Sequence, residues 1–244
     1  MTAPPPPAPE PKAGGLSDLS DDALGFGVLE LRTARDVVLR PRVVLEAWMT
    51  QGPSGGGHYA RPLRLYLALN AILMLVLFLQ GGSAMMLGII PPGMVDPLIA
   101  ASGKSRDAFM ADADGWMTLV MVPLMSLFYA LAATPLLRWW DPERLGWRRG
   151  IRAAFGYLCA VTVPLLPFSW WMYGQGGDLG LLVGNSAMFI AIIVAFMRMG
   201  AGRWYRSPVV GLAKAFGLWI TILLAGTVGS VPVFLIGVLA GRFA

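Results

Sequence analysis

The chain has 244 residues, of which 56% are hydrophobic and only 14% are charged, and its formal net charge is +5. A typical soluble domain is about 25% charged, so this composition excludes a soluble globular protein. The Lys and Arg residues fall between apolar runs and form no patch with interleaved aromatic residues, which argues against a nucleic-acid partner.

The amino-terminal quarter of the chain precedes the first long apolar run. We expect residues 1–15, which are rich in proline, to form a disordered tail. Residues 16–61 predict cytoplasmic or interfacial amphipathic helices, because helix-starting residues cluster at Ser17–Ala23 and the next apolar side chains share one helical face: Val28, Leu31, Ala34 and Val38. After Pro41, the segment Arg42–Met49 predicts a second short helix, with Trp48 at the depth of the lipid head groups.

Residues 62–244 predict an all-α, polytopic helical membrane domain. Five apolar stretches approach or exceed the roughly 18 to 20 residues that cross a bilayer, and we expect transmembrane helices at about residues 65–82, 116–137, 153–173, 179–197 and 215–239. Between the first two, Pro91–Gly115 predicts a polar loop. The last stretch contains Gly226, Gly229, Ser230 and Pro232, which leaves open whether it spans fully or re-enters the membrane.

The residues that flank the predicted spans indicate where each span meets the interface and how the chain is oriented. Trp116 precedes the second span, Trp139 and Trp140 follow it, and Trp170 ends the third, as in the aromatic belts of membrane proteins. With the amino terminus in the cytoplasm, the inside segments hold seven, five and four Lys or Arg residues, and the outside segments hold two, none and one. This asymmetry predicts a multi-pass protein with a cytoplasmic amino terminus and an outer carboxyl terminus.

Two stretches near the first span carry a family resemblance: Leu31–Trp48 (LRTARDVVLRPRVVLEAW) and Tyr59–Leu75 (YARPLRLYLALNAILML). They resemble the start of an uncharacterised bacterial family of multi-span membrane proteins, domain of unknown function 3667, at Tyr59, Pro62, Arg64, Tyr66 and Leu67. The approach to the last span is also similar to the family, at Arg198, Arg203, Trp204 and Tyr205. Many members carry an amino-terminal zinc ribbon, whose place the proline-rich tail takes here. The resemblance implies a protein of the bacterial inner membrane and no particular activity.

No motif in the chain predicts catalysis. Gly52 and Gly57 have the spacing of a phosphate loop, but His58 and Tyr59 follow where that loop needs Lys and Ser or Thr. His58 is the only histidine, so no metal site made of several histidines can form. The predicted polar loop holds three aspartates: Asp107, Asp112 and Asp114. They favour a solvated acidic segment, and the alternative is a weak cation site or a docking loop. We therefore expect no catalytic residue, no metal site and no cofactor, and favour a non-enzymatic protein.

The candidate functional residues are basic side chains at the cytoplasmic face and polar side chains within the spans. The basic candidates bind anionic lipids or a protein partner, or they merely orient the chain during insertion. They are Arg32, Arg35, Arg40, Arg42, Arg61, Arg64, Arg148, Arg149, Arg203 and Arg206. The intramembrane candidates are Asn70 and Asn185.

Two functions follow from these residues. The first is a non-enzymatic inner-membrane protein for envelope organisation, or an accessory subunit, whose basic face binds anionic lipids, a protein partner or a second copy of the chain. The second is a small transporter or lipid-translocating protein, in which Asn70 and Asn185 face a polar pathway. A polar cavity at mid-membrane favours the second function, and a solid bundle core argues against it.

Overall fold

The computed structural model describes residues 27–80, 92–172 and 177–243. These residues form helices joined by loops, and none of them belongs to an extended strand. The proline-rich tail and the predicted helix start at Ser17–Ala23 lie outside the described residues.

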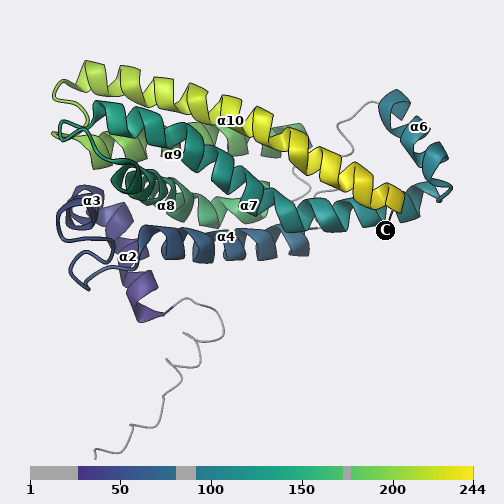
Figure 1. Cartoon of the computed structure of the whole chain (residues 1–244), viewed down its shortest axis with the longest axis horizontal. Helices are drawn as coiled ribbons and strands as arrows, with labels where there is room; N and C mark the ends of the chain where they lie inside the picture. The colour runs from purple at the N-terminus through teal and green to yellow at the C-terminus, as the bar shows by residue number, and fades with distance from the viewer. Residues whose placement is uncertain (1–26, 81–91, 173–176, 244) are drawn as a thin grey trace, which may run out of the picture.

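The helices follow one another in the order α2 (Val28–Leu39), α3 (Pro41–Thr50), α4 (Pro62–Leu79), α6 (Pro92–Ser102), α7 (Arg106–Trp140), α8 (Trp147–Met172), α9 (Gly177–Gly200) and α10 (Pro208–Phe243). Among the described residues, five helices are long and apolar enough to cross a membrane: α4, α7, α8, α9 and α10. They run along one common direction as a bundle (Figure 1). The predicted all-α, polytopic fold is therefore confirmed.

The last apolar stretch forms a single helix. α10 continues for 36 residues through Gly226, Gly229 and Pro232. It is one continuous helix, long and apolar enough to cross a membrane, which favours a full span over a re-entrant segment. Its glycines serve close packing against α7: a Cβ atom added at Gly241 would lie 2.9 Å from the Phe109 ring. Small residues of this kind let two helical backbones approach each other within a membrane.

The predicted polar loop at Pro91–Gly115 is wrong over most of its length. It contains α6 and the first three turns of α7, which begins at Arg106 rather than Trp116. Ser105 caps the start of α7, because its hydroxyl accepts a hydrogen bond from the Ala108 N–H at 3.3 Å. Phe109 and Ala113 then follow at helical spacing and are fully buried. A charged segment becomes helical here because one of its faces is apolar and packs against the rest of the protein.

The apolar core has two parts. The larger part joins α2, α3 and the five long helices and includes Trp48, Tyr157 and Phe196. The smaller part lies where α6, α7 and α10 meet, around Phe109 and Met117. Figure 1 shows α7 and α10 reaching toward α6 beyond the end of α4. We call the end of the bundle that carries α2, α3 and the loops 51–61, 141–146 and 201–207 the basic end, and the end that carries α6 the opposite end.

Helices α2 and α3 lie at the basic end, with α2 crosswise to α4 (Figure 1). Trp48 of α3, which the sequence placed at the depth of the lipid head groups, does not face lipid, because its side chain is fully buried within the protein. Its indole N–H donates to the Ala60 carbonyl at 3.1 Å. Its ring fits against Gly156 of α8, where an added Cβ would lie 2.8 Å from Cζ3. Trp48 therefore anchors α3 on the bundle.

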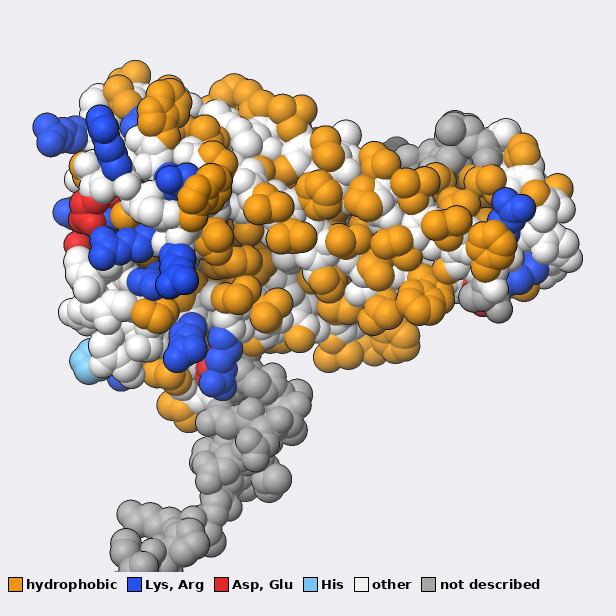
Figure 2. All heavy atoms as spheres, viewed as in Figure 1, with side chains coloured by type: hydrophobic (Ala, Val, Ile, Leu, Met, Phe, Trp, Pro, Cys, Tyr) orange, Lys and Arg blue, Asp and Glu red, His pale blue; other side chains and the backbone are white. Residues whose placement is uncertain are grey.

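The surface of the bundle has the pattern of a membrane protein. Figure 2 shows apolar side chains over the middle of the molecule, many Lys and Arg side chains at the basic end and few at the opposite end. Trp139 and Trp147 are exposed near the basic end, and Trp116 and Trp170 are exposed on the same helices further toward the opposite end. Tryptophan favours the two interfaces of a bilayer, so these positions fit the predicted aromatic belts. Trp140, also placed in a belt by the sequence, instead packs against Phe196 within the protein.

Candidate functional site

The basic end collects the candidate arginines from four separate parts of the chain. Arg32, Arg35, Arg40 and Arg42 come from α2 and the start of α3, Arg61 and Arg64 from the start of α4, Arg148 and Arg149 from the start of α8, and Arg203 and Arg206 from the loop before α10. The structure divides these ten residues into those that hold the protein together and those that face outward.

Arg203 is the most enclosed of the ten, with a side chain only 9% exposed. Its guanidinium contacts three carboxylates: Asp141 at 2.5 Å, Glu46 at 3.0 Å and Glu143 at 3.2 Å. Burial by itself lowers the pKa of Arg203, but the hydrogen bond to Asp141 and the charges of the three carboxylates outweigh it and raise the pKa. Arg203 therefore ties α3 and the loops 141–146 and 201–207 together and does not offer its charge to a ligand.

Arg64 also has an internal partner. Its Nε lies 2.9 Å from a carboxylate oxygen of Glu30, whose side chain is 2% exposed. The other Glu30 oxygen accepts the Gly27 N–H at 2.9 Å, and the Thr33 hydroxyl accepts the Ala60 N–H at 2.8 Å. The Arg64 and Thr33 contacts fasten α2 to the start of α4 and to the loop before it, and the Gly27 contact caps α2 itself.

The same contacts explain why α2 turns an unexpected face inward. Val28 and Leu31, which the sequence placed on the packing face with Ala34 and Val38, are 72% and 58% exposed. The buried face instead contains Glu30, Thr33, Ala34, Asp36 and Val37. The predicted face is therefore only partly correct, because ion pairing and hydrogen bonding of Glu30 and Thr33 decide the rotation of the helix.

Two further candidates form exposed ion pairs. Arg35 contacts the adjacent Asp36 at 2.8 Å, and Arg149 contacts Glu143 at 3.5 Å. Both arginine side chains are more than half exposed. Both residues are therefore accessible from outside the protein. Ion pairs at such exposed positions also contribute little to stability.

The remaining six candidates are exposed and have no carboxylate of residues 27–80, 92–172 or 177–243 within ion-pair distance: Arg32, Arg40, Arg42, Arg61, Arg148 and Arg206. We call these six the free arginines. On α2, which carries Arg32 and ends at Arg40, the outward face also holds Val28, Leu31 and Leu39. Cationic and apolar groups side by side suit the boundary between head groups and hydrocarbon, where arginine side chains reach toward the water.

Two arginines that the sequence did not single out for a specific contact hold the ends of α2 and α3. Arg198 of α9 donates to the Leu39 carbonyl at 3.1 Å, and Arg152 of α8 donates to the Trp48 carbonyl at 2.7 Å. Both carbonyls lie in the last turn of a helix, where they lack partners within that helix. No sequence signal marks these contacts, because the partners are more than 100 residues apart.

The structure brings Asn70 and Asn185 to the same cavity. It has a volume of about 470 Å³ and lies among α4, α7, α8, α9 and α10. Apolar side chains form most of its wall, and further polar ones come from Tyr66, Ser126, Tyr129, Thr162 and Ser169. The Asn70 amide donates to the Tyr66 carbonyl at 2.8 Å, and the Ser126 hydroxyl to the Val122 carbonyl at 2.6 Å. The bundle is thus hollow at this level, with at least two of its polar groups bonded to their own helices.

At the opposite end, two of the aspartates form ion pairs with nearby basic residues. Asp112 contacts Lys104 at 2.6 Å, and Asp96 contacts Arg106 at 2.7 Å. Among the described residues, no three His, Cys, Asp or Glu side chains come together as ligands for a metal ion.

The comparisons with known proteins leave the family resemblance a prediction. Neither a protein-family model nor a curated protein nor a solved structure matches the chain.

Proposed function

We propose that this chain is a non-enzymatic protein of the bacterial inner membrane whose basic end faces the cytoplasm and binds anionic lipid head groups. The six free arginines carry this proposal. Bound lipid would let the protein organise lipids in the envelope or serve as an accessory subunit held at an anionic surface.

The surroundings of the free arginines support lipid as their ligand. They lie at the basic end, next to an apolar belt (Figure 2). Arg32 and Arg40 belong to α2 and its end, whose outward face also carries the exposed Val28, Leu31 and Leu39. A lysine or arginine near an anionic surface contributes about 1 kcal/mol to binding. Several together produce a clear preference for anionic over zwitterionic lipid.

A lipid titration tests the proposal. The purified full chain, in a neutral detergent, is titrated with phosphatidylglycerol or phosphatidylcholine, and native mass spectrometry counts the bound lipids. The test variant combines Arg32→Gln, Arg40→Gln and Arg42→Gln. The control is Arg242→Gln at the opposite end, where the guanidinium lies over the Phe243 ring.

The proposal predicts tighter binding of phosphatidylglycerol, weakened by salt. The triple variant should lose at least about tenfold in affinity, given about 1 kcal/mol per charge, and Arg242→Gln should bind as the wild type does. Equal binding of the two lipids, or unchanged binding by the triple variant, would leave the free arginines as an orientation signal or as a surface for an acidic protein partner.

The cavity around Asn70 and Asn185 supports a second candidate function, a small transporter or a lipid-translocating protein. The test is flux of neutral solutes, or movement of a fluorescent phospholipid between leaflets, in proteoliposomes. We expect Asn70→Leu to abolish such flux, because the amide lines the cavity. Val231→Ala is a suitable control, since Val231 lies on the exposed surface of α10. Wild-type protein that gives no flux above empty vesicles would remove this candidate.

A further inference from the structure

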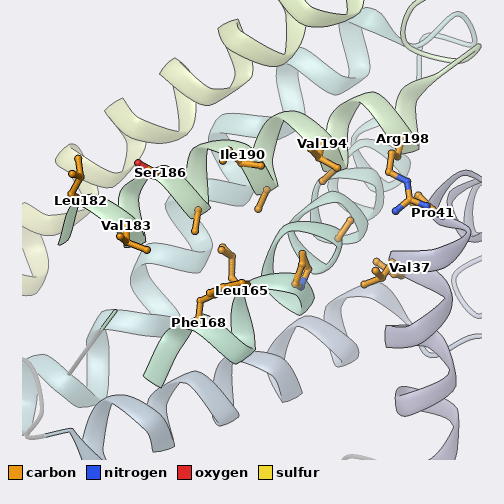
Figure 3. A pocket seen from close by; sticks show the side chains of 16 residues that line it. Val37, Pro41, Leu165, Phe168, Leu182, Val183, Ser186, Ile190, Val194 and Arg198 are labelled. Carbon is orange, nitrogen blue, oxygen red and sulfur yellow. The ribbon is translucent and has the colours of Figure 1, made fainter. Parts of the chain in front are cut away.

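A groove of about 580 Å³ runs along the lipid-facing side of α8 and α9. Figure 3 shows the side chains of the 16 residues that line it, with Leu182 toward one end and Arg198 beside Pro41 at the other. Apart from Ser186 and Arg198, every lining residue is apolar. The groove is separate from the Asn70 cavity, although Leu165 contributes to the walls of both.

The sequence of α9 explains the hollow. Ala187, Ala191 and Ala195 recur at every fourth position and lie on one face of the helix. Their small side chains leave space between α9 and α8. Larger side chains, including Phe168 from α8 and Ile190 from α9, stand beside this space as walls.

The dimensions and lining of the groove suit a hydrocarbon chain. From Leu182 to Arg198 the groove follows α9 for about 24 Å at the usual rise of the α-helix, which is most of the ~30 Å hydrocarbon thickness of a bilayer. Apolar walls offer water no hydrogen-bond partners, so an extended acyl chain fills such a space better than water does.

The basic end of the groove suits a phosphate group. Arg198 is exposed, and one of its Nη atoms is held by the Leu39 carbonyl at 3.1 Å. Its other N–H groups have no carboxylate partner among the described residues, and guanidinium pairs well with phosphate oxygens. Pro41, the first residue of α3, lines the same end (Figure 3). The positive end of the α3 dipole therefore lies at the groove mouth as well.

We propose that the groove between α8 and α9 is a binding site for one phospholipid, whose acyl chain lies along Ala187, Ala191 and Ala195 and whose phosphate binds Arg198. The site deepens the proposed function and rests on it in one respect, since it assumes that the basic end lies at the head-group level. Arg198 is not one of the free arginines, so the two ideas can be tested apart.

The test is retention of lipid by the purified full chain, measured by native mass spectrometry after extraction with a mild detergent from phosphatidylglycerol-containing nanodiscs. Ala187→Phe fills the floor of the groove, and Arg198→Gln removes its charge. Their matched controls are Ala213→Phe, on the exposed surface of α10, and Arg242→Gln, at the opposite end of the bundle. Ala187→Val serves as a smaller filling substitution if Ala187→Phe does not fold.

We expect wild-type protein to retain one phospholipid per chain and both controls to do the same. The two groove variants should lose at least about tenfold of this occupancy, and Ala187→Phe should melt near the wild-type temperature. Retention by folded Ala187→Phe or Ala187→Val overturns the groove site. The groove site is also overturned if the wild-type protein is a dimer and Ala187→Phe makes it a monomer, because the groove is then occupied by a second copy of the chain.

The titration of the triple variant separates the failure of this inference from that of the proposed function. If the Arg32, Arg40 and Arg42 substitutions weaken lipid binding and the groove variants do not, the basic face stands and the groove site falls. If only the groove variants lose lipid, the groove site stands and the proposal for the free arginines falls. Unchanged binding in both sets overturns both ideas.

Discussion

Arg203 and Asp141, which are 62 residues apart in the sequence, form a buried ion pair in which Nε of the arginine lies 2.5 Å from a carboxylate oxygen. The Asp141 side chain is fully buried and also accepts the Glu143 N–H at 3.0 Å. The pair fastens the loop between α9 and α10 to the loop between α7 and α8, and through Glu46 to α3. Long helices that end at the basic end are thereby held to one another.

Replacing Arg203 with Met should destabilise the protein by about 3 to 5 kcal/mol, because it leaves the Asp141 carboxylate buried without its partner. The melting temperature in detergent measures this loss. Arg206→Met is the control, since Arg206 is exposed in the same loop, and it should change stability by no more than about 0.5 kcal/mol. Equal melting of the two variants would contradict a structural role for the pair. Adding Asp141→Asn to Arg203→Met should restore part of the lost stability.

Arg64→Gln should loosen α2 without unfolding the bundle. It removes the cation next to Glu30, which is 2% exposed, but Arg64 itself is 54% exposed. Solvent weakens this pair, so a loss of about 1 kcal/mol is expected. Hydrogen exchange of the α2 amides should become faster, and Arg61→Gln should leave it unchanged. Protection of α2 that is the same in both variants would mean that the Thr33 and Ala60 contact suffices.

Gly156→Ala should destabilise the docking of α3 on α8. The new Cβ would lie 2.8 Å from the buried Trp48 ring, and forcing extra volume into a packed core costs about 1 to 3 kcal/mol. Gly217→Ala in α10 is the matched control, because nothing lies within 4 Å of its added Cβ. We expect a lower melting temperature for Gly156→Ala only. If both variants melt at the wild-type temperature, α3 moves away from the added Cβ without a loss of stability.

The orientation can be checked with topology reporters. Five spans and a cytoplasmic amino terminus place Ala244 outside the cytoplasm. A reporter that works only outside the cytoplasm should therefore be active when it is fused after Ala244. A reporter inserted between Gly202 and Arg203 would perturb the ion pair described above, so the loop at 52–57 is the better cytoplasmic position. Alkaline phosphatase activity at Ala244 and none at the loop is the expected result. The reverse pattern would invert the orientation and place the free arginines outside.

The periodicity and length of the apolar runs were enough to predict five membrane-spanning helices. Crossing a hydrocarbon core requires an unbroken apolar helix whatever its neighbours are, so this property is local and can be read from the sequence. The ends of the helices were harder to place. The first turns of α7 are rich in aspartate, and they are helical because Phe109 and Ala113 pack against other helices. That packing cannot be seen from α7 alone.

By itself, the sequence determined the fold class, the approximate spans and the concentration of basic residues at one end. Only the tertiary structure decided what each arginine does, since an ion pair depends on which carboxylate lies beside it in space. Arg203 and Arg206 are three positions apart in one loop, yet the first is enclosed by three carboxylates and the second is exposed. The groove ending at Arg198 likewise exists only because α8, α9 and the α2–α3 corner meet there. Such sites arise from packing between distant segments, which a local pattern of residues does not encode.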